Sequence, residues 1–501
     1  MQALSAEQSI LDGNAEVKKL LKFVRNNAED FNAYDMEKEI FSRLMQVGLH
    51  AMQLYFGERG TGDIGSRLEL EEGVVLKKEN RLRKRDYFSV FGKIEVPRTC
   101  YRQAGMSGVM PLDGMVNFPE RCYSYLLQEW MDFLSIRDTF KESEITLTKL
   151  LGLKVSQSRF EVISRDTCKH YDKFYETKDT PPSDSEGEVQ ALEFDGKGVP
   201  VIKKEAAKIK ARQSKGEKRQ KKKEAMVGVS YTVDKKERPP SEVAKNLVYP
   251  EKKKSLDKEK VEVKAKNIRR LASLERNRRE IVEELSDDAK RRNPEHTKPL
   301  VVVMDGALHL WKLVASVLAG IEYTGILDII HVVEYLWDAV HAIHGEKYPK
   351  SRKWIYDHLL SILQGDVGRV TGGLKQTLSK RKLSKNRRLA LKRVITYFEN
   401  HRQWMEYDKY LSAGYPIGSG IVESTCGHTV KDRMEGTGRR WSINGAEATL
   451  VLRSIYTSRD WDEYWIEYMV IENQRLYGKQ LEAIGYADSY YKRTAMELKA
   501  A

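Results

Sequence analysis

The sequence predicts an α/β protein in which a mixed sheet is flanked by helices, and three patterns support this fold class. Residues 300–304 (LVVVM) form a wholly apolar run that ends in Asp305-Gly306, as expected of a strand buried at the centre of a sheet. Residues 226–233 (MVGVSYTV) alternate in the way that strands do. A third apolar run, 325–330, leads into a long stretch with helical spacing.

The N-terminal part of the chain predicts a separate α+β region. Residues 1–60 carry apolar side chains at helical spacing, so they are expected to be helical. Residues 61–176 begin with strand-like alternation, clearest at 87–96, and continue as helices. A polar, Pro-containing stretch at 177–188 is typical of a linker.

A helix-turn-helix pattern lies at residues 146–166. One helix is followed by a turn at Gly152, and Ser156 is a suitable N-cap for the next helix. Ser156, Gln157 and Arg159 are then expected at the exposed start of the second helix, where helix-turn-helix proteins contact DNA. An ordinary helical hairpin predicts the same pattern.

The positive charge of the chain is concentrated in one interval. The net charge is +14, and residues 203–300 contain 31 basic and 17 acidic side chains, so the whole excess lies there. It is densest at 203–223, with 11 Lys and Arg against two Glu. Such a block usually neutralises phosphates, which makes nucleic acid the expected partner; a solvated connector is the alternative.

Composition argues against several other classes of protein. The four cysteines are far apart and form no C-x-x-C pair, which argues against a disulfide scaffold and fits a reducing compartment. No apolar stretch is long enough for a membrane helix, and the N-terminus lacks a secretory signal pattern. A cytoplasmic, nucleoid-associated protein without a membrane partner is therefore expected.

Three acidic residues are the candidate catalytic group. Asp195 and Asp305 each precede a glycine at the end of an expected strand, and Glu423 follows the Gly418-Ser419-Gly420 break in the first turn of an expected helix. Three carboxylates suit Mg²⁺ or Mn²⁺, and two such ions would activate an attacking oxygen and stabilise a leaving oxygen. Asp-Gly alone is also a common turn, so the prediction depends on the combination.

Four runs of sequence carry a family resemblance: FDGKGVP, VVVMDGALHLW, ILDIIHVVEYLWDA and GYPIGSGIVESTCGHTVKDRMEGTGRRW. From about residue 85 to residue 455 the chain resembles the Kra-type family of bacterial insertion-sequence DDE transposases. The resemblance implies an RNase H-like catalytic domain with Asp195, Asp305 and Glu423 as its metal-binding triad. It also implies cleavage and transfer of DNA strands, with the element ends and target DNA as partners.

The charge and helical patterns, together with the resemblance in the case of the all-helical insertion, predict how the rest of the chain is divided. The RNase H-like core would be interrupted by charged insertions and by one all-helical insertion, and would be followed by a helical tail. The expected parts are 189–340 (with a basic insertion at 203–224 and a charged insertion at 235–298), the helical insertion 341–412, the last part of the core 413–470, and the tail 471–501.

Further residues are candidates for supporting roles. Asp328-x-x-His331 resembles a motif of related transposases that orients the triad or the scissile phosphate; a strand-end aspartate and a core histidine are the alternative. Cations after Glu423 are expected to hold the DNA backbone, and an aromatic residue there either stacks on an unpaired base or closes the core. These residues are Lys431, Arg433, Arg439, Arg440 and Trp441.

The family resemblance and the sequence motifs also predict the cofactors and the assembly state. Two Mg²⁺ or Mn²⁺ ions are expected; no zinc is expected, since Cys100 stands alone where related proteins carry a cysteine pair. No phosphate-loop motif predicts a nucleotide cofactor. Joining two DNA ends implies a homo-oligomer. The rivals are an RNase H-like nuclease without strand transfer and a non-catalytic or repurposed DNA-binding protein, and the three intact acids argue against the second.

Overall fold

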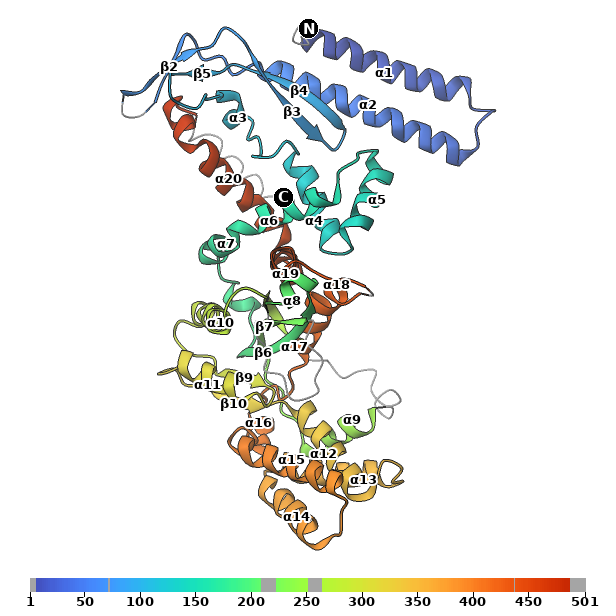
Figure 1. The fold of residues 1–501 in the computed structure, drawn as a ribbon, viewed down its shortest axis with the longest axis vertical. Helices are drawn as coiled ribbons and strands as arrows, with labels where there is room; N and C mark the ends of the chain where they lie inside the picture. The colour runs from blue at the N-terminus through green and yellow to red at the C-terminus, as the bar shows by residue number, and fades with distance from the viewer. Residues whose placement is uncertain (1–5, 71–72, 209–221, 251–263, 437, 487–501) are drawn as a thin grey trace. The chain divides into compact units, whose positions relative to one another are not determined.

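The computed structural model describes residues 6–70, 73–208, 222–250, 264–436 and 438–486. The chain divides into two compact units: unit 1 is Met1–Thr177 with Asp460–Ala501, and unit 2 is Lys178–Arg459 (Figure 1). Most of the basic block at 203–223 lies outside the described residues, as do 251–263 and the end of the predicted tail. None of the helices in the described ranges has the length and apolar character needed to span a membrane.

Unit 1 begins with two long helices and two small antiparallel sheets. Helices α1 and α2 pack on each other, β1, β2 and β5 form one sheet, and β3 and β4 form a hairpin in which Arg83 pairs with Arg98. The elements are α1 (Ala6–Asn26), α2 (Ala33–Arg59), β1 (Arg67–Glu69), β2 (Val75–Lys78), β3 (Arg83–Ser89), β4 (Gly92–Arg98), β5 (Tyr101–Arg102) and α3 (Pro111–Met115).

A small helical bundle follows, made of α4 (Tyr125–Ser135), α5 (Phe140–Leu151) and α6 (Gln157–Thr167). Gly152 ends α5 at φ 69°, a conformation that favours glycine, and Ser156 precedes α6 at the N-cap position. The bundle buries apolar side chains from all three helices, including Leu127, Met131, Leu147, Phe160 and Ile163.

Ser156 stands at the predicted N-cap position of α6. The Ser156 side chain makes no capping hydrogen bond to α6; its hydroxyl lies 3.2 Å from that of Ser158 instead. The Leu150 side chain, near the end of α5, is 58% exposed. Ser156, Gln157 and Arg159 lie exposed at the start of α6.

The C-terminal part of the chain completes unit 1. Helix α20 (Trp461–Ala483) runs without a break through the predicted boundary at residues 470 and 471, so that boundary is wrong. The helix belongs with the N-terminal region because it packs on α3 and α7 (Tyr171–Thr177). The Tyr477 hydroxyl donates to the Phe118 carbonyl at 2.8 Å, and His170 lies 2.6 Å from Glu472.

Unit 2 contains a five-stranded mixed sheet in the order β10-β9-β6-β7-β8. Strands β6, β7 and β8 are antiparallel neighbours, whereas β9 and β10 run parallel to β6. The predicted mixed sheet flanked by helices is therefore present. The strands are β6 (Val189–Pro200), β7 (Lys222–Val233), β8 (Lys266–Ser273), β9 (Leu300–Met304) and β10 (Thr324–Leu327).

The charged interval 235–298 is not an insertion, contrary to the prediction. It contains α9 (Pro240–Val248), strand β8 and helix α10 (Arg278–Arg292), and the last two belong to the core of unit 2. Strand β8 reads KNIRRLAS, so it lacks an apolar pattern. Its Arg269 is nevertheless buried, because Asp288 and Glu284 of α10 neutralise it.

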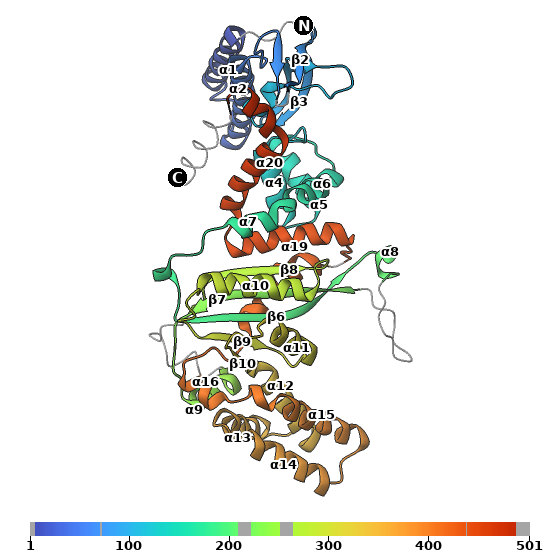
Figure 2. The ribbon, with the colours of Figure 1, turned by 90° about the vertical axis from the view of Figure 1, so that its left-hand side faces the viewer.

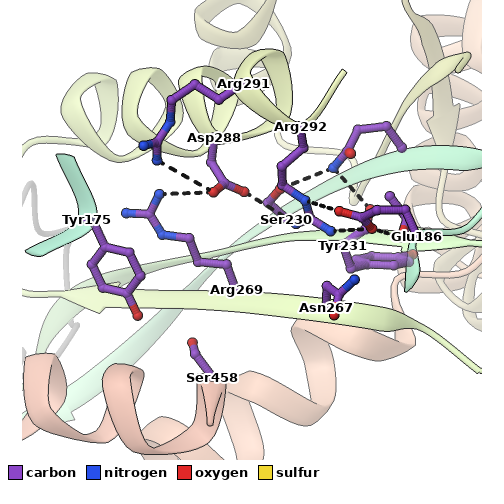
Figure 3. A network of polar contacts seen from close by, with 12 residues as sticks. Tyr175, Glu186, Ser230, Tyr231, Asn267, Arg269, Asp288, Arg291, Arg292 and Ser458 are labelled. Atoms are coloured by element: carbon purple, nitrogen blue, oxygen red, sulfur yellow. Dashed lines mark hydrogen bonds and ion pairs between the residues drawn. The ribbon is translucent and has the colours of Figure 1, made fainter. Parts of the chain in front are cut away.

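These charges form a buried network between α10 and the sheet (Figure 3). Arg292 donates to Glu186 at 2.8 and 2.9 Å and lies 3.4 Å from Asp288, which in turn pairs with Arg269 of β8 at 3.3 Å. Each buried charge thus has an opposite partner, which is what allows so charged a segment to pack. On the same face, the Leu285 side chain packs against Gly228 of β7.

The outer edge of the sheet is covered by helix α19 (Ile443–Ser458), which runs along β8 (Figure 2). Backbone N–H groups of β8 that lack a neighbouring strand donate to α19 side chains: Arg270 to the Ser458 hydroxyl at 2.8 Å and Ala272 to the Ser454 hydroxyl at 3.0 Å. Covering the edge in this way removes a row of unpaired donors.

The remaining elements of unit 2 are helices, and the described chain between β10 and α17 contains no strand. They are the 3-10 helices η3 (Ser183–Ser185) and η5 (Arg402–Trp404), α8 (Lys203–Ala206), α11 (Leu308–Val317), α12 (Ile329–His344), α13 (Ser351–Leu363), α14 (Val367–Lys380), α15 (Lys385–His401), α16 (Tyr407–Ser412), α17 (Gly420–Thr425), the π-helix η6 (Cys426–Lys431) and α18 (Asp432–Met434).

Candidate active site

Two of the predicted acids lie side by side on neighbouring strands. The parallel register pairs Phe194 of β6 with Met304 of β9, so the next residues, Asp195 and Asp305, are neighbours. Strand β9 ends before Asp305, as predicted. Strand β6 does not end at Asp195 but stays paired as far as Pro200, because β7 begins at Lys222 and forms a long hairpin with it. Asp195 is therefore held by its pairing with Val227 of β7.

Local contacts orient both aspartates. The Gly196 N–H donates to Asp195 Oδ1 at 2.6 Å, and the Cys426 thiol donates to Oδ2 at 3.3 Å. Burial, followed by the charge of Asp195, raises the pKa of this thiol. On the other strand, Asp305 Oδ1 accepts from the Ala307 N–H at 3.0 Å.

Helix α17 brings the third acid to the same face of the sheet. Side chains alternate along β6, so Phe194 faces α10 whereas Glu193 and Asp195 face α17. Glu423 lies in the first turn of α17, as predicted, and its carboxylate accepts from the Ser419 hydroxyl at 3.3 Å. Its side chain is exposed to solvent.

Asp328 and His331 lie beside Glu423. Asp328 is the N-cap of α12; its Oδ1 also accepts from the Ser419 N–H at 3.0 Å, and its Oδ2 lies 2.7 Å from His331 Nδ1. Candidate ligand atoms of Asp328, His331 and Glu423 all lie within 4.8 Å of one another. Within the described ranges, the ligand atoms of Asp195, Asp305 and Glu423 do not come that close as a group. The binding of two shared metal ions by these three residues therefore stays a prediction.

The electrostatics of the cluster favour a bound cation. Burial raises the pKa of Asp305, and nearby Asp195 raises it further; burial and the charge of Asp328 likewise raise the pKa of Glu423. Carboxylates crowded in this way carry more negative charge than their surroundings compensate. Their oxygen atoms are hard donors, so the residues present fit Mg²⁺ or Mn²⁺.

The Asp328–His331 pair has the opposite character. The hydrogen bond and charge of Asp328 raise the pKa of His331 to about 9 despite partial burial. Burial would raise the pKa of Asp328, but hydrogen bonds from His331 and Ser419 outweigh it and lower the pKa. The pair is therefore an aspartate–imidazolium ion pair near neutral pH, without net charge, and its His331 ring is the cationic member beside the acids.

The sequence prediction missed one buried acid, Glu193. Its Oε1 accepts from the Tyr231 hydroxyl and its Oε2 from the Val422 N–H, both at 2.7 Å. Burial raises its pKa to about 8. The signal was present: Glu193 stands between the apolar residues Leu192 and Phe194 and two positions before Asp195, hence on the same face. Through Val422 it joins the strand of Asp195 to the helix of Glu423.

Two of the predicted DNA contacts are wrong. Arg433 and Trp441 are 1% and 6% exposed, and the guanidinium lies 4.3 Å from the indole ring. Trp441 is buried because its segment adds to the end of β6: the Ile202 N–H donates to its carbonyl at 2.9 Å. Arg439 bonds the Arg433 carbonyl at 2.8 Å. Lys431 and Arg440 are exposed and remain candidates.

No protein-family model matches this chain, and no curated protein matches it in sequence. The transposase resemblance therefore stays an expectation from the four sequence runs. The fold and the acidic cluster of unit 2 are the observations from which the function has to be inferred.

Proposed function

We propose that the protein is a DDE transposase that cleaves DNA strands and transfers their 3′ ends to target DNA in a metal-dependent reaction. One observation carries the proposal: the parallel register of β6 and β9 places Asp195 beside Asp305. Glu193 then holds the helix of Glu423 against the same face of the sheet, and Asp328 accepts from the Ser419 N–H at the start of that helix. In this proposal, three acids separated by more than 100 residues each time act in one region.

The architecture of unit 2 supports an RNase H-like core. Three antiparallel strands are followed by two parallel ones, with helices on the faces of the sheet, and the first acid lies on the central strand β6. A helical section separates β10 from the helix that carries Glu423. Both features agree with what the family resemblance implies.

Asp195, Asp305 and Glu423 would hold the divalent ions. When bound, two such ions supply activation of the attacking oxygen and neutralisation of the leaving oxygen. The Asp305 backbone is fixed by the Trp311 indole, which donates to its carbonyl at 2.8 Å. His331, protonated near neutral pH, presents a positive charge that can pair with a phosphate oxygen of the bound strand.

Other exposed residues supply affinity for DNA in this proposal. Ser156, Gln157 and Arg159 at the start of α6 would contact the element ends, whereas Lys431 and Arg440 of unit 2 would contact the DNA backbone. Joining two ends requires at least two active sites, so we infer that the working form is a homo-oligomer associated with the nucleoid.

The test is a cleavage and joining assay on DNA that carries the sequences flanking the gene, with Mg²⁺ and strand-resolved product analysis. Asp195→Asn, Asp305→Asn and Glu423→Gln are each expected to lower cleavage by at least about 1,000-fold while leaving DNA binding intact, because each removes a ligand carboxylate. Asp287→Asn, at an exposed position of α10, is the matched control and should cleave normally.

Two outcomes would replace the proposal. Cleavage by the unaltered protein without joining of precut ends would indicate a nuclease of the same fold. Binding without any cleavage would indicate a DNA-binding protein that has no catalytic role. Normal cleavage by any one of the three variants would remove that residue from the catalytic group.

A further inference from the structure

The helical pair α1–α2 has little core of its own. The two helices are antiparallel, and Figure 1 shows their connecting loop as the end farthest from β3 and β4. The second half of α2 is covered, since Gly48 packs closely on the Phe91 ring at the turn between β3 and β4. Of the α1 side chains that the structure describes, Leu20 alone is buried. Helices gain most of their stability from packing, so the half of the pair next to the loop lacks a partner.

Four large apolar side chains lie exposed on this half of the pair. They are Val17 and Leu21 of α1 and Phe41 and Leu44 of α2, and each is between 39% and 65% exposed. Their spacing of three or four residues makes one stripe on each helix. An exposed apolar stripe on two neighbouring helices is typical of a surface that binds a partner.

The two stripes point to the same side of the pair. Leu20 marks the side of α1 that faces α2, and Arg43, which lies over the Phe23 ring of α1, marks the side of α2 that faces α1. At 100° per residue, each stripe is turned from its marker by about 60–160° in the same rotational sense. In antiparallel helices the same sense of rotation leads to the same side. We call these four residues the apolar face.

The two helices carry opposite charges near the apolar face. Residues 17–25 of α1 contain four Lys and Arg and no acid, whereas residues 29–39 contain five Asp and Glu and one Lys. Lys18, Lys22, Arg25 and Glu37 are all exposed. None of these four forms an ion pair with another residue in the part of the chain that the structure describes. Both signs of charge are therefore available to a partner.

These charges favour one way of pairing two copies of the chain. Gly13 lies against His50, so 12 residues further along α1 and 12 back along α2, Arg25 is level with Lys38 and next to Glu37. Rotation about an axis parallel to the helices lays α1 of one copy on α2 of the other at the same level, so Arg25 meets Glu37 of the second copy. A perpendicular axis lays α1 on α1, where like charges face each other.

We propose that two copies of the chain associate through the apolar face, with α1 of each copy packed on α2 of the other in a four-helix bundle. The inference deepens the proposed function, in which the working form is a homo-oligomer, because it names the surface that joins two copies. It uses no catalytic step. A bundle of this kind buries the apolar stripes at its centre and leaves the charges at its rim.

The size of the face fits a reversible dimer. Helix α1 has 21 residues and is about 32 Å long, and a pair of helices is about 20 Å wide, so the face measures about 600 Å² on each copy. A total of about 1,200 Å² lies at the lower end of the range for specific interfaces. We therefore expect a dimer that dissociates on dilution.

The experiment is sedimentation equilibrium of the full-length protein without DNA, at concentrations up to about 50 μM. The unaltered protein should approach about 116 kDa, twice the 57.8 kDa of one chain. The double variant Leu21→Glu, Phe41→Glu should raise the dissociation constant by at least about 100-fold, because a two-fold dimer buries each side chain twice. Both side chains are exposed in one copy, so the helical circular dichroism should be unchanged.

Leu150→Glu is the matched control. It makes the same change at a leucine of unit 1 that is 58% exposed but belongs to α5, so the dissociation constant should be unchanged. The charges are tested separately. Arg25→Glu and Glu37→Lys should each weaken the dimer by about 3- to 30-fold, and the variant that carries both should regain it to within about threefold, because the pair is restored with reversed signs.

The outcomes separate this inference from the proposed function. A monomer at the highest concentration, or a dimer unaffected by Leu21→Glu, Phe41→Glu, would overturn the inference even if the protein cleaves and joins DNA. Equal weakening by Leu150→Glu, or no recovery in the variant with both charges reversed, would also overturn it. If the protein dimerises as expected but cleaves no DNA, the interface stands and the transposase proposal falls.

Discussion

Asp132 in unit 1 and Glu193 in unit 2 are both completely buried acids, and burial raises the pKa of the first to about 7 and of the second to about 8. Their partners differ. Asp132 of α4 accepts from the Ser164 hydroxyl of α6 at 2.6 Å, which joins two helices of a bundle. Glu193 accepts from a strand side chain and from the backbone of the helix that carries Glu423.

The comparison shows that burial and a raised pKa do not by themselves mark a functional acid. The charges of Asp166 and Glu129, which belong to the helical bundle, act on Asp132, whereas the charges of Asp328 and Glu423, which belong to the candidate site, act on Glu193. We therefore interpret Asp132 as a residue that stabilises a fold and Glu193 as one that positions a site. Four substitutions test this distinction.

The largest effect is expected from Glu193→Leu. It leaves the Tyr231 hydroxyl and the Val422 N–H buried without an acceptor, which should lower the free energy of unfolding by about 2–5 kcal/mol. It also frees the start of α17, and a shift of about 1 Å in Glu423 should slow DNA cleavage by about 100-fold. Urea unfolding and single-turnover cleavage measure the two effects.

Glu193→Gln is the matched control for that variant. Its amide oxygen can accept from Val422 while its amide group donates to the Tyr231 oxygen, so both contacts are kept. The equilibrium constant for unfolding and the rate of cleavage should both stay within about threefold of the values for the unaltered protein. Loss of cleavage in Glu193→Gln with the fold intact would mean that the carboxyl group itself takes part in the reaction, and our interpretation of Glu193 as a positioning residue would be wrong.

A pH-dependent effect is expected at Asp132. Its folded pKa of about 7 lies above the ordinary value of 3.8, so the folded state holds a proton that the unfolded state releases. The stability from the protonated acid is fully present below about pH 4 and is lost as the pH rises toward 7. Relative to Asp132→Asn, which cannot ionise, the protein should lose up to a few kcal/mol between pH 4 and pH 8.

The measurement for Asp132 is the free energy of unfolding of both proteins at several pH values. A difference between them that does not change with pH would show that Asp132 is not protonated in the folded state. DNA cleavage by Asp132→Asn should equal that of the unaltered protein at pH 7, because the residue lies in unit 1 and has no part in the acidic cluster.

The smallest effect is expected from Tyr231→Phe. It removes one donor to Glu193 and keeps the ring, so the free energy of unfolding should fall by about 0.5–1.5 kcal/mol. Cleavage should change little, since the Val422 contact that holds α17 remains. If Tyr231→Phe slowed cleavage as much as Glu193→Leu does, the contact of Glu193 with Tyr231 of β7, and not its contact with α17, would be the one that positions Glu423.

Local patterns were enough for much of the fold. The apolar run 300–304 predicted β9, the alternation at 226–233 predicted most of β7, and Gly152 with Ser156 predicted the turn between α5 and α6. These predictions succeed because each depends on neighbouring residues: a buried strand needs apolar side chains, and a helix end needs a residue that tolerates φ above zero.

Long-range contacts decided what the patterns left open. Strand β8 is charged in sequence and becomes a core strand only because α10 supplies partners for Arg269. Arg433 and Trp441 were expected at a DNA surface and are buried, because their segment adds to the end of β6. Charge and aromaticity make a residue a candidate for DNA binding, but the segment that packs over it determines whether its side chain is exposed to solvent.

For the candidate site, the sequence determined which acids are available, and the tertiary structure decided how they are grouped. Asp195, Asp305 and Glu423 could be named from glycine-flanked positions, yet only the strand register makes the two aspartates neighbours. Only the packing of α17 on β6 recruits Glu193 and places Asp328 and His331 next to Glu423. The physical reason is that sheet pairing and helix packing bring together residues that are far apart along the chain. A local pattern of side chains does not specify which distant residues will be in contact.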